Sequence, residues 1–90
     1  MMLNATDLSR LKWRSRRGML ENDLVLQTFY ERHESGLDPV TVAGLNLLLE
    51  LGDNDLWDLV AGRDELPSGS PAEMRDVLAM LRACEAARQG

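Results

Sequence analysis

The chain has 90 residues, which suits one small domain with a single core, because a chain of this length buries only roughly 60–65% of its unfolded surface. Hydrophobic residues make up 44% of the chain, a proportion that excludes disorder over its whole length. No apolar segment approaches the ~20 residues of a membrane span, and no signal-peptide pattern follows Met1. The single cysteine, Cys84, excludes a disulfide framework and a cysteine-based zinc site, and it suits a reducing compartment.

Charge is unevenly distributed along the chain, whose formal net charge is −5. Residues 1–17 contain five basic residues and one acidic residue, whereas residues 18–90 contain five basic and fourteen acidic residues. A net acidic domain is a poor general nucleic-acid binder, since neutralising phosphates requires surplus Lys and Arg. The basic segment, which includes Trp13, leaves three interpretations open: a solvated helix face, a nucleic-acid contact, or a docking face for an acidic protein surface.

Two helices are predicted in the first half of the chain. The first begins near Thr6, a suitable N-cap, and ends before Gly18, where we expect the left-handed conformation that often follows a helix. The second covers about residues 19–34. Leu20 and Leu24 lie off its apolar stripe, which predicts contacts on two sides of this helix.

Three further helices are predicted after residue 36. One follows Asp38, an N-cap with proline behind it, and runs to about residue 51; a short one, capped by Asp53 or Asn54, ends near residue 61. After a polar loop over residues 63–69, a capping box opens the last helix, whose apolar stripe includes Cys84. Residues 86–90 are expected to fray. Because no strand pattern occurs, the sequence predicts an all-α fold, a single small bundle of about five short helices in one domain over residues 1–90.

Catalytic arrangements are missing from the sequence. A lone His33 and a lone Cys84 cannot build a metal site without distant carboxylates, and both lie on apolar stripes, which favours structural roles. No glycine-rich phosphate loop follows a strand. We therefore expect no catalytic residues, no metal, no bound cofactor and no enzymatic activity.

Residues 16–23, RRGMLEND, contain an Arg-Gly-x-x-Glu motif. This segment resembles the signature of the FAD assembly factors of succinate dehydrogenase, the SdhE family. Residues 48–57, LLELGDNDLW, are similar to that family's second signature, a leucine–glutamate helix end followed by an acidic turn and Asp-Leu-aromatic. The resemblance covers about residues 8–62. One position departs from it, because Asn22 stands where the family usually has leucine.

The resemblance implies a small chaperone rather than an enzyme. It would bind the flavoprotein subunit of succinate dehydrogenase, and in bacteria also that of fumarate reductase, and promote covalent attachment of FAD. We further expect a bacterial cytoplasmic protein, a monomer or weak dimer, with no nucleic-acid partner and no membrane span. Carried onto this chain, the partner-binding residues are Arg16, Arg17, Gly18, Glu21, Asp23 and Trp57.

Elementary chemistry gives the motif residues suitable roles. Gly18 bares the backbone for close approach, Arg17 offers a planar fork of donors, and Glu21 lies near a positive helix end. The competing interpretation of the motif is a helix corner whose charges only cap. The competing function for the chain is a small basic-helix module that binds nucleic acid or acts in regulation. Salt-dependent binding to DNA or RNA would favour the module, and co-purification of a flavoprotein would favour the chaperone.

Overall fold

Five α-helices and one short 3₁₀ helix, with no strand, form within residues 5–15 and 18–89, the part of the chain that this computed structural model describes. Their bounds are α1 (Ala5–Arg14), α2 (Leu20–His33), η1 (Glu34–Gly36), α3 (Pro39–Leu49), α4 (Asp53–Val60) and α5 (Ala72–Gln89). The predicted all-α fold with five helices is confirmed. No described helix combines the length and the apolar character that crossing a bilayer requires.

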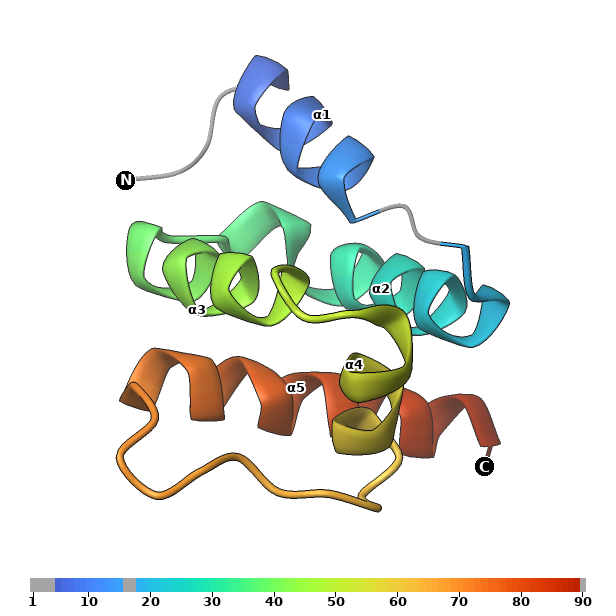
Figure 1. Cartoon of the computed structure of the whole chain (residues 1–90). Coiled ribbons are helices and arrows are strands. Elements are labelled where there is room, and N and C mark those ends of the chain that lie inside the picture. Colours follow the sequence, from blue (N-terminus) through green and yellow to red (C-terminus); the bar gives the residue numbers. More distant parts are fainter. Residues whose placement is uncertain (1–4, 16–17, 90) are drawn as a thin grey trace.

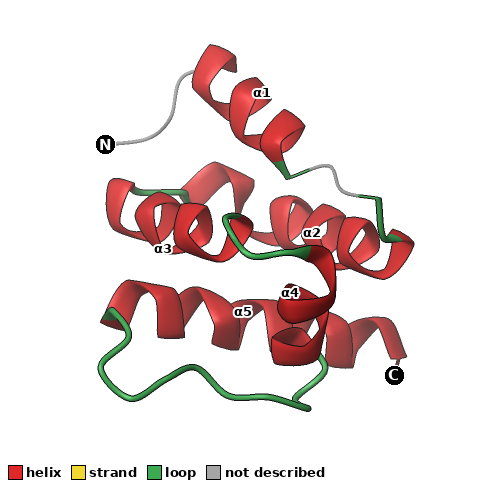
Figure 2. Ribbon diagram, viewed as in Figure 1, coloured by secondary structure: helices red, strands yellow, loops and turns green. Residues whose placement is uncertain are grey.

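The helices are stacked in layers around one core (Figure 1). Helices α2 and α3 form the middle layer, α5 runs beneath them and contacts both, and α1 lies above. The short α4 crosses in front of α5 and contacts α2 as well. A long loop joins α4 to the start of α5 (Figure 2). The radius of gyration, 12.3 Å, agrees with the ~12 Å expected of a compact domain of this length.

The apolar stripes of α2, α3, α4 and α5 meet in the core. Phe29, Leu45, Leu48 and Cys84 are completely buried, and the burial of Cys84 confirms the stripe predicted for the last helix. Loss of contact with water raises the pKa of the Cys84 thiol, because burial disfavours the thiolate. This cysteine is therefore a small core side chain.

Helices α3 and α5 make the most extensive contact in the fold, and Gly44 lies at their crossing. A Cβ atom added at Gly44 would lie 2.6 Å from the backbone carbonyl carbon of Glu73, well inside van der Waals contact. The backbones of the two helices thus approach each other where α3 has no side chain. This close approach was not predicted from the sequence.

Helix α1 is attached to the other helices by a small set of side chains. Leu11 is its buried residue, and Leu8 packs against the core more loosely. The hydroxyl of Ser15 donates to the carbonyl oxygen of Leu11 and shares a hydrogen bond with the hydroxyl of Tyr30. Burial raises the pKa of Tyr30, although the bond to Ser15 opposes this shift. Removal from water therefore keeps this phenol protonated at the base of α1.

Two basic side chains of α1 have partners elsewhere in the chain. The ammonium of Lys12 lies 3.1 Å from a carboxylate oxygen of Glu34, and the guanidinium of Arg14 donates to the amide oxygen of Asn46 at 2.6 Å. The side chain of Trp13, between them in sequence, is 71% exposed. The basic face of α1 is thus partly engaged by the acidic body beneath it.

The predicted helix ends are partly confirmed. The Oδ1 of Asp38 accepts from the backbone N–H of Thr41 at 2.7 Å, and this hydrogen bond holds the pKa of Asp38 below its usual value. The prediction for α4 was wrong, because its N-cap is Gly52, with no side-chain cap, and Asp53 is already the first helical residue. Here the negative charge of Asp53 stabilises the positive helix end without capping it.

Two arginines of α5 hold the polar loop before it. Arg82 donates to the carbonyl oxygens of Leu59 and Asp64, at 2.8 and 3.0 Å, and Arg75 donates to that of Pro67 at 2.9 Å. Helix α5 itself continues to Gln89, so most of the terminal segment that we expected to fray is helical. There Glu85 accepts hydrogen bonds from the side chains of the last two described residues.

Candidate functional site

The Arg-Gly-x-x-Glu motif lies at the corner where the chain enters α2. Met19 has an extended backbone at the N-cap, and Glu21 and Asp23 lie in the first turn. The side chain of Met19 makes no cap hydrogen bond, and the positive end of the helix dipole favours the two carboxylates. Glu21 is exposed and Asp23 is half-buried. We call the described part of this motif, residues 18–23, the motif corner.

Gly18 does not have the left-handed backbone that we expected. The described glycines with positive φ are Gly62 and Gly69, and the helix before Gly18 ends earlier, at Arg14. A Cβ atom at Gly18 would lie 3.6 Å from a carboxylate oxygen of Asp53, an ordinary contact. Glycine is therefore not required here by backbone strain. Its lack of a side chain leaves the backbone open beside Asp53.

Asn22 joins the motif corner to the second signature. Its side chain is 1% exposed, and its amide nitrogen donates to the carbonyl oxygen of Asp53 at 3.0 Å. The amide oxygen of Asn22 is buried and has no hydrogen-bond partner among the described residues. The two signatures, which lie about thirty residues apart in sequence, are therefore adjacent in space at the first turns of α2 and α4.

Trp57 lies one helical turn after Asp53 on α4, on the same side of the helix. It is half-buried and packs against the core, so it supports α4 as well as presenting part of its ring at the surface. Arg16 and Arg17 lie outside the described residues. The structure thus brings together Gly18, Glu21, Asp23 and the start of α4, with Trp57 one turn away.

Leu20 is a surface residue that the sequence analysis did not include among the binding residues. It is 66% exposed, which contradicts the expectation that α2 is contacted on this side within the chain. Its position off the apolar stripe of α2 was the available signal. An exposed leucine between Gly18 and Glu21 gives the motif corner an apolar contact beside its charges.

Both residues that were expected to have structural roles, the lone histidine and the lone cysteine, pack within the fold. His33 packs against Phe29 with ring centroids 5.0 Å apart, and Cys84 is buried in the core. Among residues 5–15 and 18–89, no three His, Cys, Asp or Glu side chains are placed to share a metal ion. The motif corner offers contact chemistry, consisting of bare backbone, an exposed leucine and carboxylates.

Comparison with known proteins shows the family to which the chain belongs. Residues 9–85 match the family model Sdh5, which is described as flavinator of succinate dehydrogenase. The chain belongs to this family of FAD assembly factors. Its members are assembly factors rather than catalytic enzymes, and the resemblance drawn from the two signatures is confirmed.

Curated relatives carry the same description. The chain is 47% identical over 77 residues to the FAD assembly factor SdhE of Ralstonia nicotianae, a match that covers 83% of this chain and 80% of the relative. It is 38% identical over 82 residues to the FAD assembly factor SdhE of Pseudomonas aeruginosa, covering 89% and 92%. These relatives are bacterial. No solved structure matches the chain significantly.

Proposed function

We propose that this chain binds the flavoprotein subunit of succinate dehydrogenase through its motif corner and so promotes covalent attachment of FAD to that subunit. The observation that carries the proposal is the exposure of the corner. The bare backbone of Gly18 and the side chains of Leu20 and Glu21 face solvent beside the start of α4. Family membership supplies the client class. A fumarate reductase flavoprotein is a second client of the same chemistry, and we place the process in the bacterial cytoplasm.

The chemistry of the corner suits docking. Carboxylates at a helix N-terminus accept hydrogen bonds from a partner's donors, and Leu20 supplies apolar area that becomes buried on contact. Arg16 and Arg17, which precede the corner, add cationic donors to the proposed contact. In this proposal, as the family resemblance implies, the flavoprotein itself forms the bond to FAD. This chain then acts by holding its client in a competent conformation.

The test is complementation of cells that lack their native assembly factor. We expect the wild-type chain to restore covalent flavin, seen as fluorescence of the flavoprotein band on a denaturing gel. We expect a several-fold weaker signal from each of three variants, Glu21→Ala, Gly18→Arg and Leu20→Ser. For Glu21→Ala the reason is that truncating one partner of a buried charged pair costs roughly 2–5 kcal/mol. For Leu20→Ser it is that burying a leucine contributes about 1.5–3 kcal/mol. All three positions are exposed, so their melting temperatures should stay close to that of wild type.

The matched control is Asp76→Ala, which removes an exposed carboxylate of α5 outside the motif corner. It should flavinylate the client as well as wild type does. Wild-type flavinylation by all three corner variants would show that the corner only connects α1 to α2. Failure of the wild-type chain to restore any covalent flavin would overturn the proposed function.

A further inference from the structure

Two buried polar side chains lie one on each side of Gly18. In the described part of the chain, the buried polar or charged residues are Ser15, Asn22 and Glu85. Asn22 bonds to the start of α4, whereas Ser15 bonds to Tyr30 of α2. Burying a polar group costs free energy unless it is hydrogen-bonded, so such a residue favours one arrangement more strictly than an apolar residue does. The chain is therefore held by a polar contact before Gly18 as well as after it.

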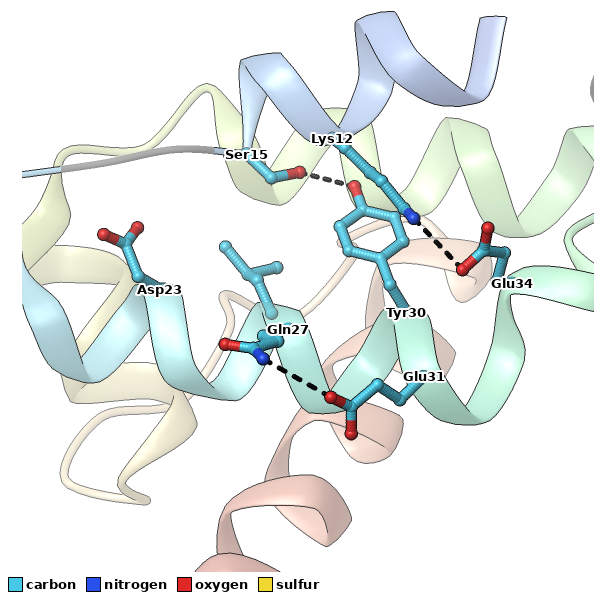
Figure 3. Close-up of a pocket in the computed structure, with 8 residues that line it drawn as sticks. Lys12, Ser15, Asp23, Gln27, Tyr30, Glu31 and Glu34 are labelled. Atoms are coloured by element: carbon cyan, nitrogen blue, oxygen red, sulfur yellow. Dashed lines mark hydrogen bonds and ion pairs between the residues drawn. The ribbon is translucent and has the colours of Figure 1, made fainter. Parts of the chain in front are cut away.

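The contact before Gly18 is a small hydrogen-bond network. Figure 3 shows the hydroxyl of Ser15 pointing toward the hydroxyl of Tyr30, where α1 ends above α2. The Ser15 hydroxyl donates to the carbonyl oxygen of Leu11 at 2.8 Å, which leaves the Tyr30 hydroxyl to donate to Ser15. The Tyr30 hydroxyl also lies 3.3 Å from the same Leu11 oxygen. Both hydroxyl protons thus have acceptors, and we call Ser15 and Tyr30 with this carbonyl the α1 anchor.

The α1 anchor fixes the end of α1 where close packing does not. A groove of about 430 Å³, lined by Ser15 and Tyr30 among others, lies between the two helices beside the anchor (Figure 3). Side chains therefore do not fill the space between α1 and α2 there. The hydrogen bonds of Lys12 and Arg14 lie at the surface, where water and salt compete with them. The anchor, by contrast, is buried and directional.

The position of Ser15 restricts the position of Gly18. Ser15 lies three residues before Gly18, and that length of chain reaches at most ~11 Å. The backbone of Gly18 lies close to α4, because a Cβ atom added there would be 3.6 Å from a carboxylate oxygen of Asp53. A shift of Ser15 would therefore move the backbone that the motif corner exposes beside α4.

We propose that Ser15 and Tyr30 are positioning residues for docking of the client flavoprotein. Their hydrogen bond holds the end of α1 on α2 and so sets where Gly18 lies within the motif corner. Ser15 is 3% exposed and Tyr30 6% exposed, so they act through the corner and not as contacts of the client. A surface whose geometry is fixed before binding loses less freedom on docking. This inference rests on the proposed function, since it assigns the residues that preorganise the same docking surface.

The experiment measures the affinity of the purified chain for the purified succinate dehydrogenase flavoprotein subunit of the same organism. Tyr30→Phe and Ser15→Ala each remove one hydroxyl of the anchor, and each should weaken binding ~fivefold. The double variant should bind about as weakly as the single variants, because all three lose the same bond. Tyr30→Phe should have a smaller effect in a Glu21→Ala background, where the corner has already lost one of its contacts.

The matched control for stability is Gly44→Ala, which crowds the crossing of α3 and α5, away from α1 and the motif corner. Measured well below its melting temperature, it should bind the flavoprotein as wild type does. If Gly44→Ala lost as much affinity as Tyr30→Phe, general destabilisation would explain the loss, and the positioning role would be wrong.

The remaining outcomes separate this inference from the proposed function. If Glu21→Ala binds weakly while Tyr30→Phe and Ser15→Ala bind as wild type does, the motif corner docks without help from the α1 anchor. Fully additive losses in Tyr30→Phe and Glu21→Ala would also overturn the positioning role, because the two residues would then act independently. If Glu21→Ala binds normally, the corner is not a contact, and both assignments fail.

Discussion

Asn22 shows how one residue can link two parts of a surface at an energetic cost. Its amide nitrogen bonds to Asp53, whereas its buried amide oxygen has no partner among the described residues. A buried unsatisfied acceptor costs about 1–3 kcal/mol, more than one ordinary hydrogen bond contributes. The link between the motif corner and α4 is thus made at the expense of stability.

Replacing this residue with the leucine that the resemblance led us to expect should stabilise the fold. Asn22→Leu removes the orphaned oxygen and adds apolar area in the core. Asp53 is only half-buried, so water can replace the donor that its carbonyl loses. We expect a gain of about 1 kcal/mol, seen as a melting temperature raised by roughly 4–8 °C. A lower melting temperature would mean that the bond to Asp53 outweighs the unsatisfied oxygen.

At the scale of helices, the features that depend on local sequence were predictable. The Asp38 N-cap and the stripe ending at Cys84 involve residues within a few turns of each other, and the structure has both. The N-cap of α4 lies one residue before the earlier of its two predicted positions, because Gly52, Asp53 and Asn54 all suit a helix start. The predicted conformation of Gly18 was wrong because α1 ends at Arg14, so that Gly18 precedes α2 instead of closing α1.

The features that depend on distant residues were not predictable from the pattern. Gly44 faces Glu73, and Asn22 faces Asp53, across about thirty residues of chain in each case. Helical periodicity defines which face of a helix is buried, but it carries no information about where two helices cross. The motif identified the residues of the motif corner. Their position beside α4 could be seen only in the folded structure.

Gly44→Ala should destabilise the protein although alanine favours helices. The added Cβ overlaps the Glu73 backbone, so α3 and α5 must separate. Overpacking costs about 1–3 kcal/mol, and a clash with backbone, which cannot rotate away as a side chain can, lies at the upper end of this range. The cost therefore exceeds the ~1 kcal/mol gain in helix propensity. We expect a melting temperature lowered by at least ~5 °C. Gly36→Ala is the control, since open space surrounds that position, and equal melting of the two variants would contradict the tight crossing.

At the scale of the whole molecule, a basic helix rests on an acidic body. Lys12 pairs with Glu34, Arg14 bonds to Asn46, and Tyr30 joins the base of α1 to α2. These internal partners occupy part of the basic face that would otherwise serve a nucleic acid. The chain's one tyrosine, Tyr30, lies in this contact, so the seating of α1 depends on the protonation of its phenol.

Tyr30 predicts a loss of stability in alkali. The pKa of Tyr30 is raised in the fold, so its contribution is fully present below the unfolded value of about 10 and is lost as pH rises through the folded value. Tyr30→Phe should be about 0.5–1.5 kcal/mol less stable at neutral pH and should lack that alkaline loss. Denaturant unfolding of both proteins across this range is the measurement. If the stability of the two proteins fell in parallel as the pH rose, Tyr30 would make no contribution to the alkaline loss.

The sparse attachment of α1 has a consequence for the motion of the chain. Its buried contact with the body is centred on Leu11, whereas α3 and α5 share an extended interface with no gap at Gly44. A helix held in this way opens at a smaller free energy than the whole domain unfolds, so its amide hydrogens exchange with solvent through local detachment. Each such excursion uncovers the part of α2 on which α1 rests, while α2 to α5 stay folded.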